Sequence, residues 1–202
     1  MGSRLFAHTG EGAPRRLSPG VTSAAIFSLG WLVSLAGDAC HVASGTTMYL
    51  WPAVPNIWRS AAWFPFLVGA SVLGAARAGA AQQLPTRKRT RVDVLTGTSL
   101  VLGLYALTAV LRGQPMVVSV TLCSAIALAI WTWWDASVAA LSVALSAAVL
   151  GPLAEIAIAA LGASRYASDA DGLWGVAPWL PALYFAAGAV ASGLWRVIEQ
   201  DG

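Results

Sequence analysis

Six apolar stretches follow one another along the chain, and short polar or charged segments separate them. The stretches cover residues 21–37, 60–78, 94–111, 116–134, 137–161 and 175–198. A bilayer core about 30 Å thick requires about 20 residues of α-helix, with a range of about 17–25. Each stretch has a length in this range, so the pattern predicts six transmembrane helices.

The apolar stretches lack the alternation expected of membrane β-strands. Strands of a membrane barrel are about 10 residues long and alternate in polarity, whereas residues 100–111 and 126–134 are continuously apolar. The chain is 57% hydrophobic and 10% charged, while soluble domains carry roughly 25% charged residues. We therefore expect an all-α integral membrane protein, a six-transmembrane-helix bundle in one domain over residues 19–202. A flexible cytoplasmic tail is expected at residues 1–18.

Positive charge gathers in alternate connections between the stretches. Nine of the twelve Lys and Arg residues belong to this set: Arg4, Arg15, Arg16, Arg77, Arg87, Lys88, Arg89, Arg91 and Arg196. Because cytoplasmic segments carry an excess of Lys and Arg, this distribution predicts that both termini are cytoplasmic. The cluster at residues 87–91 either sets this topology alone or also binds anionic lipid head groups. Such a short loop does not favour a nucleic-acid partner.

The first outer connection, residues 38–59, is long and rich in aromatic residues. It contains Trp51 and Trp58, and aromatic rings favour the membrane interface. Pro52 and Pro55 argue against a continuous helix there. This connection is expected to lie on the outer membrane surface.

The sequence offers little equipment for catalysis. Glu155 is the acid that lies well inside a predicted helix, and Asp135 lies at a helix junction. His8 and His41 fall in the tail and in a loop, so no His pair or Cys/His cluster has the spacing of a metal or haem site. No nucleophile–base pair or glycine-rich phosphate loop is evident. The pattern therefore predicts a protein that is not an enzyme and has no cofactor.

Two non-catalytic functions remain open on these residues. A small transporter could use Glu155, which follows Pro152 in the fifth stretch, because acids within the membrane often mark transport pathways. A lipid-binding protein would need aromatic walls and hydroxyl groups instead. The candidates for such a pocket are Trp63, Ser119, Thr121, Trp131, Ser142 and Ser146. The tryptophans could equally be interfacial anchors, and the hydroxyls could bond to their own helix backbone.

Small residues recur in several stretches, as at Gly188 and Ser192 in the last one. This small-xxx-small spacing lets helix backbones approach closely. It predicts either packing within one chain or contact between copies in a homo-oligomer.

Four segments resemble the insulin-induced gene (Insig) family of six-helix membrane proteins. They are Ser-Ala-Ala-Trp-Phe-Pro at 60–65 with Gly69, Ser-Val-Thr-Leu at 119–122, Trp-Thr-Trp-Trp-Asp at 131–135, and Trp-Leu-Pro at 179–181 followed by Phe185, Gly188 and Arg196. Together they span about two-thirds of the chain.

The resemblance implies a non-catalytic regulator. Insig proteins bind oxysterols in the endoplasmic reticulum membrane and retain Scap or hydroxymethylglutaryl-CoA reductase. The family's junction Asp, which matters for the partner, falls on Asp135, and its helix 2 Trp falls on Trp63. The chain departs from the family at two points. In the family an Arg follows the junction Asp, whereas this chain has Ala136, and Lys88 is the one lysine of this chain.

The most economical hypothesis is a membrane protein that holds a neutral lipid with a hydroxyl-bearing head group in an intramembrane cavity. The Ala-rich sequence points to a bacterial member, for which a diacylglycerol-like lipid replaces the oxysterol. The expected location is the bacterial inner membrane, or the endoplasmic reticulum membrane if the source is eukaryotic. A membrane-protein partner and a homo-oligomer are also expected. The alternative is a Trp-rich sensory or translocator protein that binds lipids or porphyrins, a class that typically has five helices.

Overall fold

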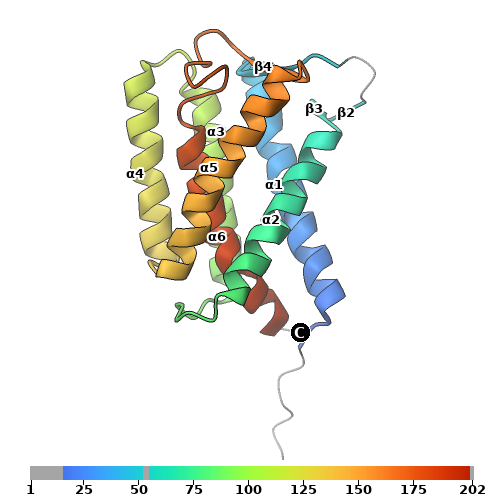
Figure 1. Cartoon of the computed structure of the whole chain (residues 1–202), viewed down its shortest axis with the longest axis vertical. Coiled ribbons are helices and arrows are strands. Elements are labelled where there is room, and N and C mark those ends of the chain that lie inside the picture. The colour runs from blue at the N-terminus through green and yellow to red at the C-terminus, as the bar shows by residue number, and fades with distance from the viewer. Residues whose placement is uncertain (1–15, 52–54, 201–202) are drawn as a thin grey trace, which may run out of the picture.

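The computed structural model describes residues 16–51 and 55–200, so residues 1–15 of the tail expected at 1–18, and Pro52, lie outside the described residues. The described chain forms a bundle of six α-helices with short strands and loops at one end (Figure 1). The helices are α1 (Pro19–Ser44), α2 (Trp63–Ala81), α3 (Arg91–Val110), α4 (Met116–Trp134), α5 (Val138–Ala160) and α6 (Leu180–Gln200). All six are long and apolar enough to cross a membrane, which confirms the predicted six-helix fold.

Helix α6 forms the centre of the bundle. Thirteen of its 21 residues are buried, and it contacts each of the other five helices. Its small residues permit this packing: a Cβ added to Gly188 would lie 3.0 Å from the α5 backbone at Ala144. On another side of α6, Gly79 of α2 lies against the backbone of Ser192. At these positions, the small-residue spacing therefore serves packing within one chain.

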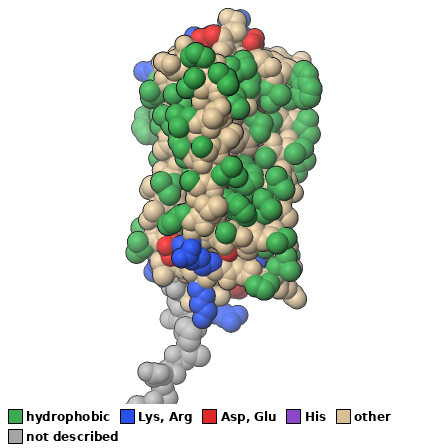
Figure 2. Space-filling view, turned by 90° about the vertical axis from the view of Figure 1, so that its left-hand side faces the viewer, with side chains coloured by type: hydrophobic (Ala, Val, Ile, Leu, Met, Phe, Trp, Pro, Cys, Tyr) green, Lys and Arg blue, Asp and Glu red, His purple; other side chains and the backbone are tan. Residues whose placement is uncertain are grey.

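The two described ends of the chain lie together. The Leu17 N–H donates a hydrogen bond to the Glu199 carbonyl oxygen at 3.1 Å. Lys and Arg side chains gather at this lower end, below a broad band of hydrophobic side chains (Figure 2). The cytoplasmic location of this end stays a prediction from its charge.

Helix α1 is longer than its apolar stretch predicted. The prediction ended it at residue 37, but the helix continues to Ser44, and Gly45 terminates it with a positive φ of 70°. Asp38 and His41 are buried in this extra segment because both have partners. The Tyr49 hydroxyl donates to Asp38 Oδ2 at 2.7 Å, and His41 Nε2 lies 2.7 Å from Thr108 Oγ1. Buried polar groups are tolerated when hydrogen-bonded, so the assignment of both residues to a loop was wrong.

Short strands connect the loops at the other end. Strand β1 (Thr47–Tyr49) pairs antiparallel with β4 (Ser164–Tyr166), so the first connection is fixed to the one before α6. Strands β2 (Asn56–Ile57) and β3 (Ser60–Ala61) form a hairpin, and α2 therefore begins at Trp63 rather than at residue 60. Helix α6 begins at Leu180 rather than at residue 175, because Gly175 adopts a positive φ of 88° in a turn.

Candidate functional site

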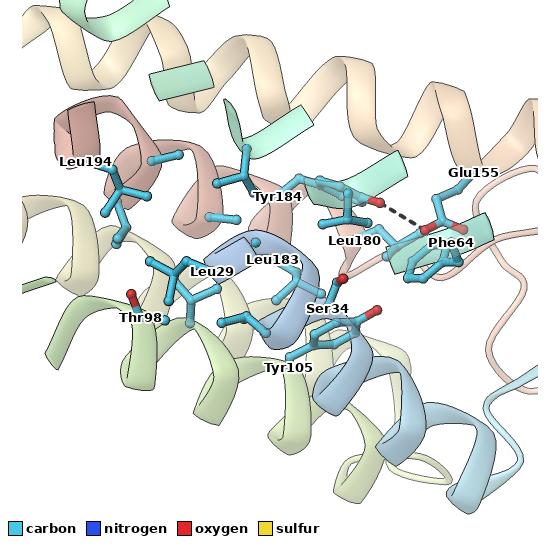
Figure 3. Close-up of a pocket in the computed structure, with 18 residues that line it drawn as sticks. Leu29, Ser34, Phe64, Thr98, Tyr105, Glu155, Leu180, Leu183, Tyr184 and Leu194 are labelled. Atoms are coloured by element: carbon cyan, nitrogen blue, oxygen red, sulfur yellow. Dashed lines mark hydrogen bonds between the residues drawn. The ribbon is translucent and has the colours of Figure 1, made fainter. Parts of the chain in front are cut away.

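A cavity of about 90 Å³ lies inside the bundle between α1, α2, α3 and α6. Most of its lining side chains are aliphatic or aromatic. Its polar lining residues are Ser34, Thr98, Tyr105, Glu155 and Tyr184. Glu155 and Phe64 lie at one end of the cavity, and Leu194 and Thr98 lie toward the other (Figure 3). The arrangement provides an apolar interior with polar groups at one end.

A groove of about 440 Å³ continues from this cavity between α2 and α5. The two spaces share the lining residues Phe64, Val68, Glu155 and Tyr184. Leu67 and Leu150 also line the groove and are largely exposed, so the groove opens on the side of the bundle. The interior is therefore reachable from the surroundings of the helices.

Glu155 lies where the cavity and the groove meet. Its carboxyl group is buried, and its Oε1 accepts a hydrogen bond from the Tyr184 hydroxyl at 2.9 Å (Figure 3). Its Oε2 has a longer contact of 3.5 Å with the Tyr166 hydroxyl. The sequence predicted an acid within the membrane region. These phenol donors explain how it is tolerated there, because they satisfy its buried carboxyl group.

A second carboxyl group, that of Asp38, lies near Glu155. A small hollow of about 10 Å³ is lined by both acids together with Tyr49 and Tyr166. Burial, followed by the nearby Asp38 carboxyl, raises the pKa of Tyr49 above its ordinary value. Burial, followed by Glu155, likewise raises the pKa of Tyr166. Both phenols therefore stay protonated and act as donors.

We call Asp38, Tyr49, Glu155, Tyr166 and Tyr184 the polar cluster. It offers hydroxyl donors and carboxyl acceptors at the end of an apolar space. Over residues 16–51 and 55–200, no group of three or more His, Cys, Asp or Glu side chains could hold a metal ion. The phenol and carboxyl groups of the cluster form hydrogen bonds with one another.

Three of the predicted site residues lie in this region. Glu155 belongs to the polar cluster, and Ser142 and Ser146 line the groove. The Ser142 hydroxyl contacts Gln82 Oε1 at 3.0 Å and the Ala139 carbonyl at 2.9 Å. The Ser146 hydroxyl donates to its own helix backbone at 2.8 Å. Both alternatives considered for these hydroxyls, lining a pocket and bonding the backbone, thus occur in the structure.

The other four predicted pocket residues lie elsewhere. Trp63 packs against aromatic rings of the first connection, and Trp131 packs edge-on against Phe185 at a centroid distance of 6.4 Å. Ser119 is buried, while Thr121 is exposed on α4. None of these four residues is among the described residues that line the cavity or the groove. Their role in ligand binding stays a prediction.

Asp135 lies at the opposite end of the bundle from the polar cluster. Its Oδ1 accepts from the backbone N–H of Arg87 at 2.7 Å, and its Oδ2 accepts from the Ser137 hydroxyl at 2.7 Å. The carboxylate thereby ties the loop between α2 and α3 to the junction of α4 and α5. The following residue, Ala136, has a positive φ of 53°, which marks a tight turn.

Sequence reasoning missed Tyr184 and Asp38. Tyr184 is 29 positions from the acid that it binds, so no local spacing connected the two. A weak signal existed, because Tyr184 is a hydroxyl-bearing residue within an otherwise apolar stretch. Asp38 was read as the first loop residue, since an acid is usually costly within a membrane helix.

The sequence resembles one curated protein closely. No family model matches the chain. It is 42% identical over 168 residues to a protein described as an INSIG protein homolog from Mycolicibacterium vanbaalenii. The match covers 83% of this chain and 81% of the relative.

Two solved structures share both the fold and much of the sequence. The crystal structure of MvINS, a mycobacterial Insig homologue from Mycobacterium vanbaalenii, matches with a TM-score of 0.86 and 38% identity over 91% of this chain and 96% of that one. A cross-linked MvINS trimer matches with a TM-score of 0.85 and 38% identity, over 90% and 95% of the two chains. The likeness therefore extends across the whole bundle.

Proposed function

This chain belongs to the Insig family, and on this premise we propose that it is a non-catalytic membrane protein that holds a neutral lipid with a hydroxyl-bearing head group. The observation that supports this proposal is the apolar cavity that ends at the polar cluster and continues into the open groove. Ligand sites are mostly apolar and contain a few convergent polar groups. Acyl or ring surface would lie along the aliphatic walls, and the head group would meet the cluster.

The composition of the polar cluster favours a neutral head group. A ligand hydroxyl can donate to the Glu155 or Asp38 carboxyl, and it can accept from the Tyr166 phenol, whose contact with Glu155 is long at 3.5 Å. An anionic head group would instead lose its hydration in this largely apolar site, where the described lining residues include no Lys, Arg or His to balance its charge. Because the lipid moves from the bilayer rather than from water, shape and these hydrogen bonds must supply the selectivity.

The contact between the buried His41 and Thr108 is consistent with a structural role. His41 Nε2 lies 2.7 Å from Thr108 Oγ1, a distance that a nucleophile and its base would show. The Thr108 hydroxyl can instead donate to the Tyr105 carbonyl at 2.6 Å, and in that arrangement His41 Nε2–H is the donor to Thr108. A ring nitrogen that carries this proton cannot accept one from Thr108. This geometry supports a structural role and fits a protein that is not an enzyme.

Of the two alternative functions considered from the sequence, the structure disfavours the translocator and leaves the transporter open. A five-helix translocator does not fit, because the described chain has six helices and belongs to another family. A small transporter that uses Glu155 stays an alternative. A transporter would produce substrate flux in liposomes, and Glu155→Gln would abolish this flux. A lipid-binding protein would produce no flux.

We also propose that the chain forms a homo-oligomer in the membrane. A trimer of the relative MvINS has been cross-linked. Helices α1 to α5 carry exposed apolar residues on which lipid or another copy could lie, whereas the described residues of α6 include none. A membrane-protein partner, as in the resemblance to Insig regulators, and location in the inner membrane if the chain is bacterial are further parts of this proposal.

Mass spectrometry of lipids that co-purify with the detergent-extracted protein tests the proposed function. Ser146→Trp places a bulky ring in the groove, whereas Leu145→Trp places the same ring on a neighbouring, half-exposed position outside it. We expect Ser146→Trp to reduce the neutral lipid per protein at least tenfold, which corresponds to about 1.4 kcal/mol, and Leu145→Trp to leave it unchanged. Wild-type protein without neutral lipid, or equal losses in the two variants, would refute the proposal.

A further inference from the structure

A second recess lies at the end of the bundle where the chain ends meet. Its volume is about 260 Å³, and it is bounded by the loop between α2 and α3, the end of α4 and the end of α6. We call it the basic pocket; its charged lining residues are Arg87, Lys88, Arg89, Arg196 and Asp135. No described residue lines both this pocket and the cavity or groove. The basic pocket is therefore a separate site.

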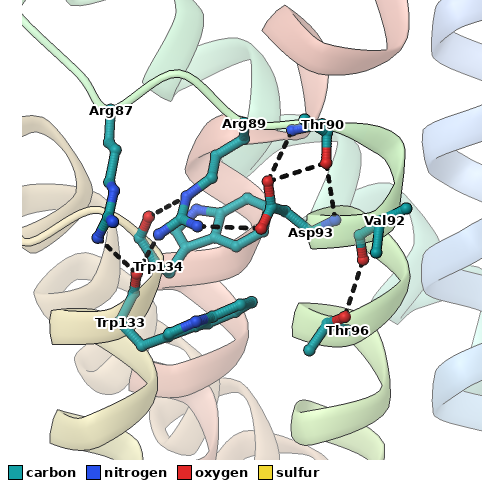
Figure 4. A network of polar contacts seen from close by, with 8 residues as sticks. All are labelled: Arg87, Arg89, Thr90, Val92, Asp93, Thr96, Trp133 and Trp134. Atoms are coloured by element: carbon teal, nitrogen blue, oxygen red, sulfur yellow. Dashed lines mark hydrogen bonds and ion pairs between the residues drawn. The ribbon is translucent and has the colours of Figure 1, made fainter.

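Arg89 is held in a fixed position in the basic pocket. Its guanidinium donates hydrogen bonds to the carbonyl oxygens of Trp133 and Trp134 at the end of α4 (Figure 4). It also pairs with Asp93 at 3.1 Å and lies 4.8 Å from the centre of the Trp133 ring. Of the five N–H donors of an arginine, these bonds use three. The remaining donors are held in place before any ligand binds.

Arg196 reaches the same pocket from α6. Its guanidinium donates to the Gly79 carbonyl oxygen at the end of α2. This bond orients the side chain and leaves most of its donors available. Two arginines more than 100 positions apart in sequence thus converge on one recess, and both are anchored by helix carbonyls. Preorganised donors of this kind lose little entropy when they bind an anion.

Two further cations stand at the rim. Arg87 is exposed, and its side chain makes one long contact of 3.4 Å with the Trp133 carbonyl. Lys88 is also exposed, and within the described part of the chain it has no hydrogen bond or ion pair. Both side chains can therefore turn toward a ligand in the pocket.

The charge of the basic pocket is not balanced from within. Its four cations line the recess with one acid, Asp135, whose two oxygens already accept from the Arg87 backbone and from Ser137. Arg89 is also paired with Asp93 outside the lining, so four cations stand against two acids. Membrane topology would require positive charge near this end, but it would not require that the charges surround a recess. The recess far exceeds the roughly 10–15 Å³ that one water needs. It has room for a larger anion.

We propose that the basic pocket binds the phosphate of an anionic lipid head group. Its position at the helix ends corresponds to the level of the head groups, and basic pockets between membrane helices on the cytoplasmic side suit such phosphates. Arg89 and Arg196 supply fixed donors, while Arg87 and Lys88 close over the phosphate from the loop. This proposal does not depend on the neutral lipid of the cavity.

The test uses full-length protein in nanodiscs of phosphatidylcholine that contain a minor fraction of phosphatidylglycerol. Native mass spectrometry after release counts the phosphatidylglycerol retained per chain. Arg87→Gln with Lys88→Gln should weaken retention roughly 30-fold, since each charge near the surface contributes about 1 kcal/mol. Lys88→Gln alone should weaken it roughly fivefold by the same constant. The matched control, Arg16→Gln with Arg77→Gln, removes two charges from the same end outside the pocket and should retain the lipid.

Each possible result decides the proposal. Selective loss in the pocket variants, with unchanged neutral lipid in the same samples, supports it. Equal loss in the control would overturn it, because surface charge alone would then explain retention. Displacement of phosphatidylglycerol by inorganic phosphate at equal concentration would overturn the assignment to a lipid in favour of a soluble phosphate. If the neutral lipid is absent but phosphatidylglycerol is lost selectively, the proposed function fails and the basic pocket stands.

Discussion

The hydroxyl of Tyr184 provides a direct test of the polar cluster. It donates the shorter of the two phenol hydrogen bonds to Glu155, at 2.9 Å against 3.5 Å for Tyr166. Tyr184→Phe removes this donor and keeps the ring, which packs against Gly151 of α5. The change therefore isolates one hydrogen bond to a buried carboxyl group.

The expected cost follows from the type of bond that is lost. A hydrogen bond contributes about 0.5–1.5 kcal/mol between neutral groups and about 1.5–3 kcal/mol to a charged group. Because Tyr184→Phe leaves the buried Glu155 Oε1 without this donor, it should lower the free energy of unfolding by about 1–3 kcal/mol. Tyr166→Phe should cost less than about 1 kcal/mol, since a 3.5 Å contact is at the limit of hydrogen bonding.

Thermal unfolding of the purified protein in one detergent measures both variants. For about 200 residues, 1 kcal/mol corresponds to roughly 2–4 °C in Tm, so Tyr184→Phe should lower Tm by about 2–12 °C and Tyr166→Phe by less than about 4 °C. The co-purifying neutral lipid should fall together with Tm in Tyr184→Phe. Equal Tm shifts in the two variants, or an unchanged Tm in Tyr184→Phe, would show that the reasoning about Glu155 is wrong.

Other substitutions test the packing and the loop contacts. Gly79→Ala should destabilise the fold by about 1–3 kcal/mol, because the new methyl group meets the Ser192 backbone; Gly74→Ala, in open space on the same helix, should be neutral or stabilise by up to about 1 kcal/mol. Similar Tm values for these two variants would contradict the close approach of α2 and α6. Asp135→Ala removes the acceptor of the exposed Arg87 N–H and of the Ser137 hydroxyl and should cost about 0.5–1.5 kcal/mol. Asp135→Asn keeps an acceptor oxygen and should cost less, so identical unfolding curves would count against the loop contact.

Hydropathy predicted the number and the middle of the helices well, because the bilayer sets their length. It failed where polar residues have partners inside the protein. Asp38 and His41 extend α1 because Tyr49 and Thr108 satisfy them. Thr108 is 67 positions from His41, and Tyr49 lies beyond the end of α1, 11 positions from Asp38, so helical periodicity could not reveal either partner.

The candidate site was predictable only in part for a related reason. Glu155 was evident as an acid in an apolar stretch, but hydropathy does not say which helices are neighbours. The cavity and groove are formed by α1, α2, α3, α5 and α6, so the predicted residues Thr121 and Trp131 of α4 do not reach them. Tyr184 lies on the central helix and could be connected to Glu155 only by the tertiary fold.

The side opening between α2 and α5 determines how occupancy of the interior would respond to its environment. If the interior holds a lipid as proposed, that lipid would enter by lateral diffusion within the leaflet without passing through water. Filling is therefore governed by the mole fraction of the ligand among its neighbouring lipids, not by a dissolved concentration. A membrane enriched twofold in that component would double the supply without any change in the cell's aqueous contents.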